Sequence, residues 1–247
     1  MGKLSTTVLA IGFLFAVPAL AEKDTFSGNG SAATVREVKD ALDKFHQGDP
    51  DGAIAILDGV LATGNLSDET IAVVHYDRGV IYASKRVWDK AIGDFAIAIE
   101  KRPRYGSAYV MLGQTYFSAG DHAKGVAALK TAIAVDPDNA DAHSNFANAL
   151  HGEGHDDEAL AQYDRAIALH DSPYAYEGRG LIYLLKGHAD KSVTDFTAAL
   201  NLKPDYFDAL VNRAMAYANL GDEKRSLADF DSAFLQHIRG KTILFAQ

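Results

Sequence analysis

Apolar residues recur at intervals of three and four residues over residues 34–240, the spacing that places them on one face of an α-helix. These helical stretches come in pairs, separated by short polar breaks such as Gly120-Asp121 and Gly221-Asp222. A glycine in the left-handed conformation ends one helix, and an acidic residue caps the next one. The pattern therefore predicts a succession of helix-turn-helix hairpins.

The hairpins repeat with a period of 34 residues. Pro103 and Pro137 are 34 residues apart, and so are Tyr82 and Tyr116. One hairpin cannot bury its apolar face alone, so stacked neighbours are expected to share a continuous core. Residues 68–71 interrupt the period as a four-residue insertion after the first unit. The six predicted units are residues 34–67, 72–105, 106–139, 140–172, 173–206 and 207–240.

Residues 75–103 and 109–137 resemble the tetratricopeptide repeat (TPR). With positions numbered from the first residue of each unit, that family has a small residue at position 8, a large one at 11, alanine at 20 and proline at 32. The unit 72–105 matches with Gly79, Tyr82, Ala91 and Pro103. The resemblance implies an all-α fold, a right-handed α-solenoid of about six helix-turn-helix repeats. It also implies a scaffold that binds a partner protein or peptide segment in a concave groove.

In that family the groove is lined chiefly by the first helices, at positions 2, 5, 9 and 12. Asparagines there can bond an extended peptide through both a donor and an acceptor. The alternative is that these groove residues are solvated and bind nothing. The predicted groove residues are Tyr76, Val80, Val110, Gln114, Phe117, Asp141, Asn145, Asn148, Tyr174, Glu177, Leu181, Asp208 and Asn212.

The groove carries acidic residues where one branch of the family has lysines. That branch clamps the terminal carboxylate of chaperone tails, and lysines at position 5 would be needed for it. This chain has Tyr76, Val110 and Glu177 at position 5, and Asp141 and Asp208 at position 2. Because like charges repel at short range, we expect a basic or neutral internal segment to be preferred over a free C-terminus.

The first residues have the order of a secretory signal peptide. Lys3 precedes an apolar run over residues 8–17, and Ala19-Leu20-Ala21 gives the small-x-small form of a cleavage site. The run is too short for a bilayer span, which needs about 20 residues. We therefore expect residues 1–21 to be removed and the protein to be exported, to the bacterial periplasm; retention as an anchor is the alternative. Residues 22–33 are polar and glycine-rich and are expected to form a disordered leader.

Composition limits the chemistry. The chain has no cysteine, which excludes disulfides and thiol nucleophiles. Its 24 basic and 33 acidic residues give a net charge of −9, so nucleic acid is not an expected partner. The sequence contains no nucleophile elbow, phosphate loop or His-Glu-x-x-His helix. We therefore expect neither an enzyme nor a cofactor.

A row of histidines follows the glycine turns. His122, His155 and His188 are spaced by 33 residues. Equivalent positions on neighbouring helices lie about 9–10 Å apart, too far for shared ligands of one ion. We therefore interpret them as polar turn residues and expect no metal site.

The C-terminal end is apolar. Residues 241–247 follow Phe234, Leu235 and Ile238, with no long polar capping helix after the last unit. This end either folds onto the last repeat or forms a contact surface. It supports a second hypothesis, a self-assembling structural module that dimerises or stacks through the solenoid ends. A third class, an enzyme or a small-ligand carrier, would need a closed pocket.

Overall fold

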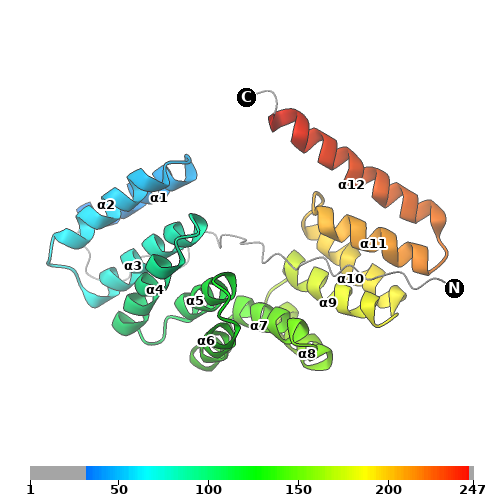
Figure 1. The fold of residues 1–247 in the computed structure, drawn as a ribbon, viewed down its shortest axis with the longest axis horizontal. Helices are drawn as coiled ribbons and strands as arrows, with labels where there is room; N and C mark the ends of the chain where they lie inside the picture. The colour runs from blue at the N-terminus through cyan, green and yellow to red at the C-terminus, as the bar shows by residue number, and fades with distance from the viewer. Residues whose placement is uncertain (1–31, 245–247) are drawn as a thin grey trace. The chain divides into compact units, whose positions relative to one another are not determined.

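The computed structural model describes residues 32–244, which fold into twelve α-helices and no strand (Figure 1). The helices alternate as first and second members of hairpins, so the predicted all-α solenoid of helical repeats is confirmed. The predicted signal peptide and most of the predicted leader lie outside the described residues. No described helix has the length and apolar character that crossing a membrane requires.

The chain divides into two compact units. Unit 1 ends at Ala128 and unit 2 begins at Leu129, so the division falls inside α6 (His122–Val135). The other helices of unit 1 are α1 (Ala32–His46), α2 (Pro50–Ala62), α3 (Asp68–Ser84), α4 (Trp88–Lys101) and α5 (Gly106–Ser118). Those of unit 2 are α7 (Ala140–Gly152), α8 (Asp156–Leu169), α9 (Pro173–Leu185), α10 (Ala189–Leu202), α11 (Phe207–Asn219) and α12 (Glu223–Leu244).

Within each unit, a first helix packs against the second helix of the repeat before it through positions 3 and 10. In unit 1, Val74 and Ile81 of α3 share a core with Leu57 of α2. In unit 2, Ala175 and Ile182 of α9 share a core with Tyr163 of α8. Small or branched side chains at these positions let the helices approach closely, and burial of the apolar faces stabilises the stack.

The interhelical glycines have the predicted left-handed backbone. Gly120 has φ +88° and Gly221 has φ +75°. The acidic residues that follow cap the next helices: the Asp121 carboxylate accepts from the Lys124 backbone N–H at 3.2 Å, and the Asp222 carboxylate accepts from that of Arg225 at 3.0 Å. These turns therefore confirm the role that the sequence predicted for the Gly-Asp pairs.

Two segments outside the repeat units are helical. Residues 68–71, the four-residue insertion in the repeat period, form the first turn of α3, where Ser67 accepts a capping hydrogen bond from the Thr70 backbone N–H at 3.2 Å. The predicted tail 241–247 is helical as far as Leu244, where α12 ends. Its sequence contains no proline like Pro103, which follows the end of α4.

An arginine–aspartate pair joins the two helices of three hairpins. Arg179 at position 7 binds both carboxylate oxygens of Asp195 at position 23, with N–O distances of 2.9 and 2.7 Å. Arg78 and Asp94 form the same pair in unit 1, and Arg213 and Asp229 form it in α11 and α12. The sequence did not predict this bidentate pair, which links the first and the second helix of each of these hairpins.

Candidate peptide-binding site

In unit 1, four predicted groove residues lie in the hydrophobic interior instead. Tyr76, Val80, Val110 and Phe117 are buried, none more than 8% exposed. The Tyr76 ring lies 5.0 Å from that of Tyr105, centroid to centroid. Burial of a large apolar side chain lowers the free energy of the folded chain relative to leaving that side chain in water. These four side chains are therefore part of the core and form no surface that a ligand could reach. Gln114, the remaining predicted residue of unit 1, is half-buried.

In unit 2, the predicted residues lie on three first helices, of which α9 contacts both α7 and α11. Asn212 of α11 donates from Nδ2 to Oε1 of Glu177 of α9 at 2.9 Å. Asn148 of α7 accepts a hydrogen bond from the hydroxyl of Tyr163, a core residue of α8. The structure therefore brings together Glu177 and Asn212, two of the predicted groove residues, on neighbouring first helices.

Further predicted residues of this face are two aspartates at helix starts, one asparagine and one leucine. Asp141 and Asp208 are exposed, in the first turns of α7 and α11. Asn145 donates from Nδ2 to the backbone carbonyl of Asp141 at 2.8 Å. Leu181 of α9 is half-buried beside the core of α10 and α11. Each side chain keeps at least part of its surface accessible to a ligand.

Two tyrosines and a lysine form one edge of this face. The Tyr174 and Tyr206 rings meet edge to face with centroids 5.4 Å apart. Lys203 lies over both rings, with its Nζ 5.1 and 4.9 Å from the two centroids, and donates to the Tyr174 hydroxyl at 3.2 Å. Cation–π contacts of this geometry hold the rings in place, and Tyr174 stays 38% exposed.

The sequence analysis missed Lys203 and Tyr206 because both precede α11 and lie outside the first-helix positions considered. The 34-residue phase does carry the signal. Tyr105 occupies the position of Tyr206 in the repeat 72–105, and the guanidinium of Arg102 lies 4.5 Å from its ring centroid. A basic residue at position 31 and a tyrosine at position 34 therefore form a recurring pair.

Burial makes the acidic groups of this face easier to protonate. Burial raises the pKa of Glu177 to about 7, the charge of Asp208 adds to this, and the hydrogen bond from Asn212 opposes it. Burial also raises the pKa of Tyr206, and the negative charge of Glu177 raises it further. A cation placed here would relieve the repulsion between Glu177 and Asp208.

The three turn histidines lie at the starts of second helices. His122 is the first residue of α6 and meets the Phe117 ring edge to face at 5.6 Å. His155 and His188 are the N-cap residues of α8 and α10. In the part of the chain that the structure describes, no group of three or more His, Asp or Glu side chains is arranged to hold a metal ion.

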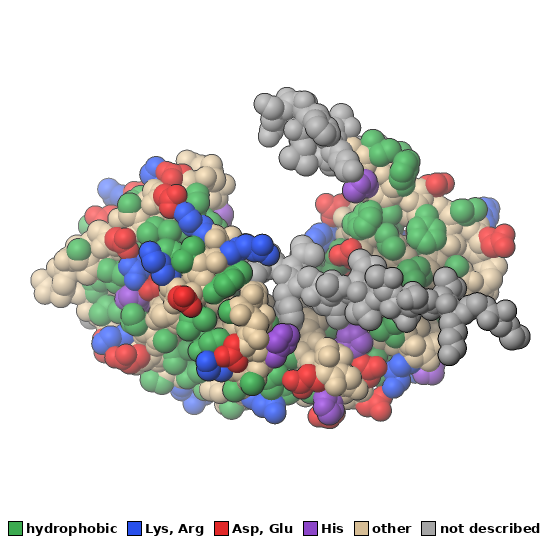
Figure 2. All heavy atoms as spheres, viewed as in Figure 1, with side chains coloured by type: hydrophobic (Ala, Val, Ile, Leu, Met, Phe, Trp, Pro, Cys, Tyr) green, Lys and Arg blue, Asp and Glu red, His purple; other side chains and the backbone are tan. Residues whose placement is uncertain are grey.

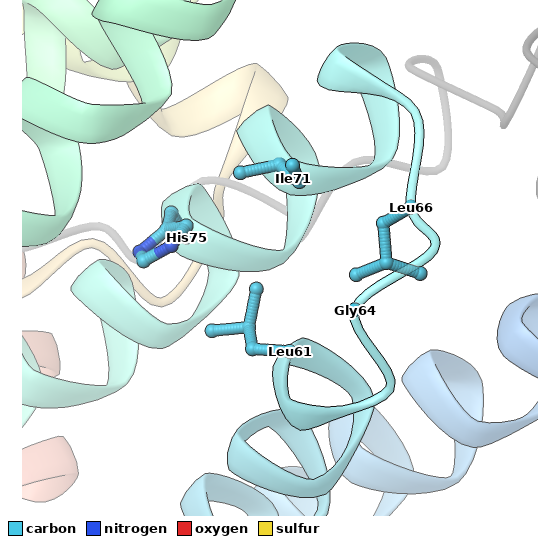
Figure 3. Close-up of a pocket in the computed structure, with 5 residues that line it drawn as sticks. All are labelled: Leu61, Gly64, Leu66, Ile71 and His75. Carbon is cyan, nitrogen blue, oxygen red and sulfur yellow. The ribbon is translucent and has the colours of Figure 1, made fainter.

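A small pocket of about 190 Å³ lies between α2 and α3, lined by Leu61, Gly64, Leu66, Ile71 and His75 (Figure 3). The His75 ring is held by a 2.8 Å contact from Nδ1 to the Asp94 carboxylate. Ligand sites usually enclose about 300–1,000 Å³. This pocket is therefore better explained by the packing of the two helices than as a binding site.

Comparison with known proteins identifies the repeat. The family described as "TPR repeat" matches residues 113–154, and the one described as "Tetratricopeptide repeat" matches residues 173–206. DnaJ homolog subfamily C member 3 of Gallus gallus is 23% identical over 210 residues, 78% of this chain and 41% of that protein. Tetratricopeptide repeat protein 13 of Homo sapiens is 24% identical, over 72% of this chain and 21% of that protein. The chain thus spans less than half the length of either relative.

Solved structures share the fold. PilW, a type IV pilus biogenesis factor, is 19% identical with a TM-score of 0.67, covering 81% of this chain and 91% of PilW. A thermophilic TPR protein of Thermus thermophilus is 20% identical with a TM-score of 0.60, covering 75% of this chain and 99% of that protein. Residues 113–154 and 173–206 therefore match tetratricopeptide repeats, and the described helices share the fold of solved proteins that contain such repeats. This fold is that of a protein–protein interaction scaffold, which implies protein or peptide partners.

Proposed function

We propose that this protein is an exported scaffold that binds a segment of a partner protein on the face of unit 2 formed by α7, α9 and α11. The observation that carries the proposal is the hydrogen-bonded pair of Glu177 and Asn212, which joins two neighbouring first helices beside an exposed tyrosine. The proposal includes no enzymatic activity and no cofactor.

The face offers the groups that an extended segment needs. Asn145, Asn148 and Asn212 supply amide donors and acceptors for a peptide backbone. Tyr174 presents an aromatic ring that Lys203 holds in place, so little conformational entropy is lost when a side chain packs on it. These features favour a peptide segment over a small molecule, which would need an enclosed pocket.

The charge of the face favours a partner segment that is basic or neutral. Glu177 already has a pKa raised by burial and by Asp208. A lysine or arginine side chain would stabilise the ionised forms of both carboxylates, whereas a terminal carboxylate would add a third negative charge. The segment is therefore expected to bind internally rather than by a free C-terminus.

Isothermal titration with synthetic peptides tests this proposal. The probes are one extended sequence with Lys, Gln or Glu at its centre, each with an amidated or a free C-terminus. We expect the affinity to fall in the order Lys, Gln, Glu, and the free carboxylate to give no gain. Tighter binding of the Glu peptide, or binding that depends on the free carboxylate, would overturn the proposal.

Variants locate the binding on this face. Glu177→Gln should weaken binding of the Lys peptide about tenfold, the size of a lost charge-assisted contact. The matched control is Glu153→Gln, which changes an exposed carboxylate at the end of α7. An equal loss in both variants would mean that the net charge of the protein, and not this site, drives the binding.

Export rests on the signal-peptide pattern of residues 1–21. N-terminal sequencing of the protein recovered from the periplasm should begin at Glu22. An intact Met1 in a membrane pellet would instead indicate the anchored alternative.

A further inference from the structure

The last helix that the structure describes, α12, keeps an apolar face that no other described helix covers. Leu227, Phe230 and Phe234 are 63%, 41% and 63% exposed. They are spaced by three and four residues, so they form one stripe along α12, here called the α12 stripe. Figure 2 shows hydrophobic side chains gathered over α11 and the described part of α12.

The same repeat positions are covered in the earlier repeats. Phe230 stands at position 24, where every earlier repeat has a side chain at most 1% exposed: Leu57, Phe95, Leu129, Tyr163 and Phe196. In unit 2, Tyr163 packs beside Ala175 and Ile182 of the next first helix. The α12 stripe therefore has the composition of a surface that another helix covers, although no described helix follows it.

The N-terminal end of the array is built differently. In all five later repeats, position 3 is fully buried and position 10 is at most 5% exposed, with side chains such as Ala175 and Ile182. In α1 these positions hold Arg36 and Asp43, and both are exposed. Burying these two charges against an apolar helix would cost several kcal/mol. The first helix of a second copy is therefore a poor partner for the α12 stripe, which argues against a head-to-tail stack.

We propose that two copies of this chain associate through their α12 stripes about a two-fold axis. Each copy supplies the same apolar surface, so one contact covers both stripes and the assembly closes as a dimer. Among the described helices, α1 presents charged side chains at the positions that would meet a neighbouring helix, whereas α12 presents an apolar stripe. A second copy placed on the stripe would remove this apolar surface from water.

The size of α12 is suited to such an interface. Its 22 residues extend over about 33 Å. Phe230 and Phe234 are the kind of aromatic side chains that dominate interface energetics. A stable dimer buries about 800 Å² on each partner. To reach this area, the contact has to include residues of α12 beyond the three that define the stripe. The exposed Leu235 beside it adds apolar surface.

Sedimentation velocity of the full chain over a hundredfold range of concentration tests the dimer. The wild-type chain should sediment with twice the mass of one chain and form no larger species. Phe234→Glu and Leu227→Glu should each raise the dissociation constant at least a hundredfold, with unchanged helix content by circular dichroism. A monomeric wild-type chain at high micromolar concentration would overturn the proposal, and so would growth into open-ended species.

Two controls distinguish this contact from other assemblies. Leu185→Glu places a charge at a side chain of unit 2 that is 61% exposed but lies off the stripe, and it should leave the mass unchanged. Arg36→Glu combined with Asp43→Lys should also leave it unchanged. Dissociation in either control would refute the two-fold contact through α12. Because these variants spare Glu177 and Asn212, the outcome is independent of peptide binding.

The lack of native cysteine permits a geometric check. A spin label on Asp231→Cys, an exposed position one helical turn from both Leu227 and Phe234, should show a short distance between copies, whereas a label on Arg36→Cys should show none as short. A two-fold axis at α12 brings equivalent residues of α12 together and leaves the two α1 helices apart. The opposite result would place the contact at the other end of the chain.

Discussion

The first helices of the two units use the same repeat positions for different purposes. At position 5, unit 1 has Tyr76, which is buried against Tyr105, and unit 2 has Glu177, which is bonded to Asn212 of the next first helix. At position 9, Val80 is buried and Asn148 is half-buried and bonded to Tyr163. The repeat register therefore specifies where a side chain points, and the side chain decides whether that place becomes apolar core or a polar surface.

The largest expected effect is a loss of stability in unit 1, where the position-5 side chain is buried. Tyr76→Ala should destabilise unit 1 by about 3–5 kcal/mol, because it removes a buried aromatic ring and leaves a cavity. The fluorescence of Trp88, the single tryptophan, reports urea unfolding of unit 1. Tyr174→Ala, at an exposed ring of unit 2, is the matched change and should cost less than about 1 kcal/mol. Equal losses would mean that Tyr76 is no more a core residue than Tyr174.

The second largest expected effect is a pH dependence of folding stability caused by Glu177 of unit 2. A carboxyl group whose pKa is raised to about 7 binds its proton more tightly in the folded than in the unfolded chain. Folding stability should therefore fall as the pH rises from about 4.5 through 7. Relative to Glu177→Gln, the wild-type chain should lose roughly 1–3 kcal/mol between pH 5 and pH 8. Urea unfolding at both pH values, followed by circular dichroism, measures this difference, and parallel pH profiles would contradict it.

A third prediction uses a feature that both units share. Arg78→Lys and Arg179→Lys should each cost about 1–2 kcal/mol, since lysine cannot bind both oxygens of the buried Asp94 or Asp195. Burial raises the pKa of Asp94, but hydrogen bonds from Arg78 and His75 outweigh it and hold that pKa below its usual range. Thermal unfolding should show similar losses for both variants. A loss confined to one unit would show that the pair does not act alike in both.

The smallest expected effect lies in the turns. Arg86 has φ +60°, in the place where the later repeats have Gly120 and Gly187. A side chain with this backbone costs about 1 kcal/mol relative to glycine. Arg86→Gly should therefore raise the free energy of unfolding by about 0.5–1 kcal/mol, after allowing for the greater freedom of glycine in the unfolded chain. Gly187→Arg should lower it by a similar amount in unit 2. Both are measured by urea unfolding, and destabilisation by Arg86→Gly would be the contrary result.

Much of the fold could be predicted from local signals. The period of 34 residues and the glycine turns such as Gly120 placed the hairpins, because a left-handed turn and a following cap are determined within a few residues. The positions at which helices begin and end were harder to predict, because they depend on caps and on prolines outside the repeat pattern. Residues 68–71 joined α3 because Ser67 could cap it, and α12 continued because no proline follows it.

The repeat register assigned Glu177 and Asn212 to adjacent first helices, and the structure shows that the two side chains meet there. Whether they bind a partner stays a prediction. The register could not separate them from Tyr76, because burial depends on the volume and polarity of all neighbours and not on repeat position alone. Lys203 was missed for a different reason: it follows the second helix α10, and only positions of first helices were considered.

The arginine–aspartate pair has a consequence for how the chain opens. The repeats of α3–α4, α9–α10 and α11–α12 each carry it. The first repeat has Asp40 and Ile56 at the paired positions, and the two middle repeats have Leu112 and Ala128, then Phe146 and Gln162. In a nearest-neighbour array, the hairpin with the weakest internal coupling unfolds first. Amide protons of α1–α2 and of α5 to α8 are therefore expected to exchange with solvent deuterium ahead of those of the three paired hairpins. Partial unfolding would then open these stretches while α3–α4 and α9–α12 stay folded.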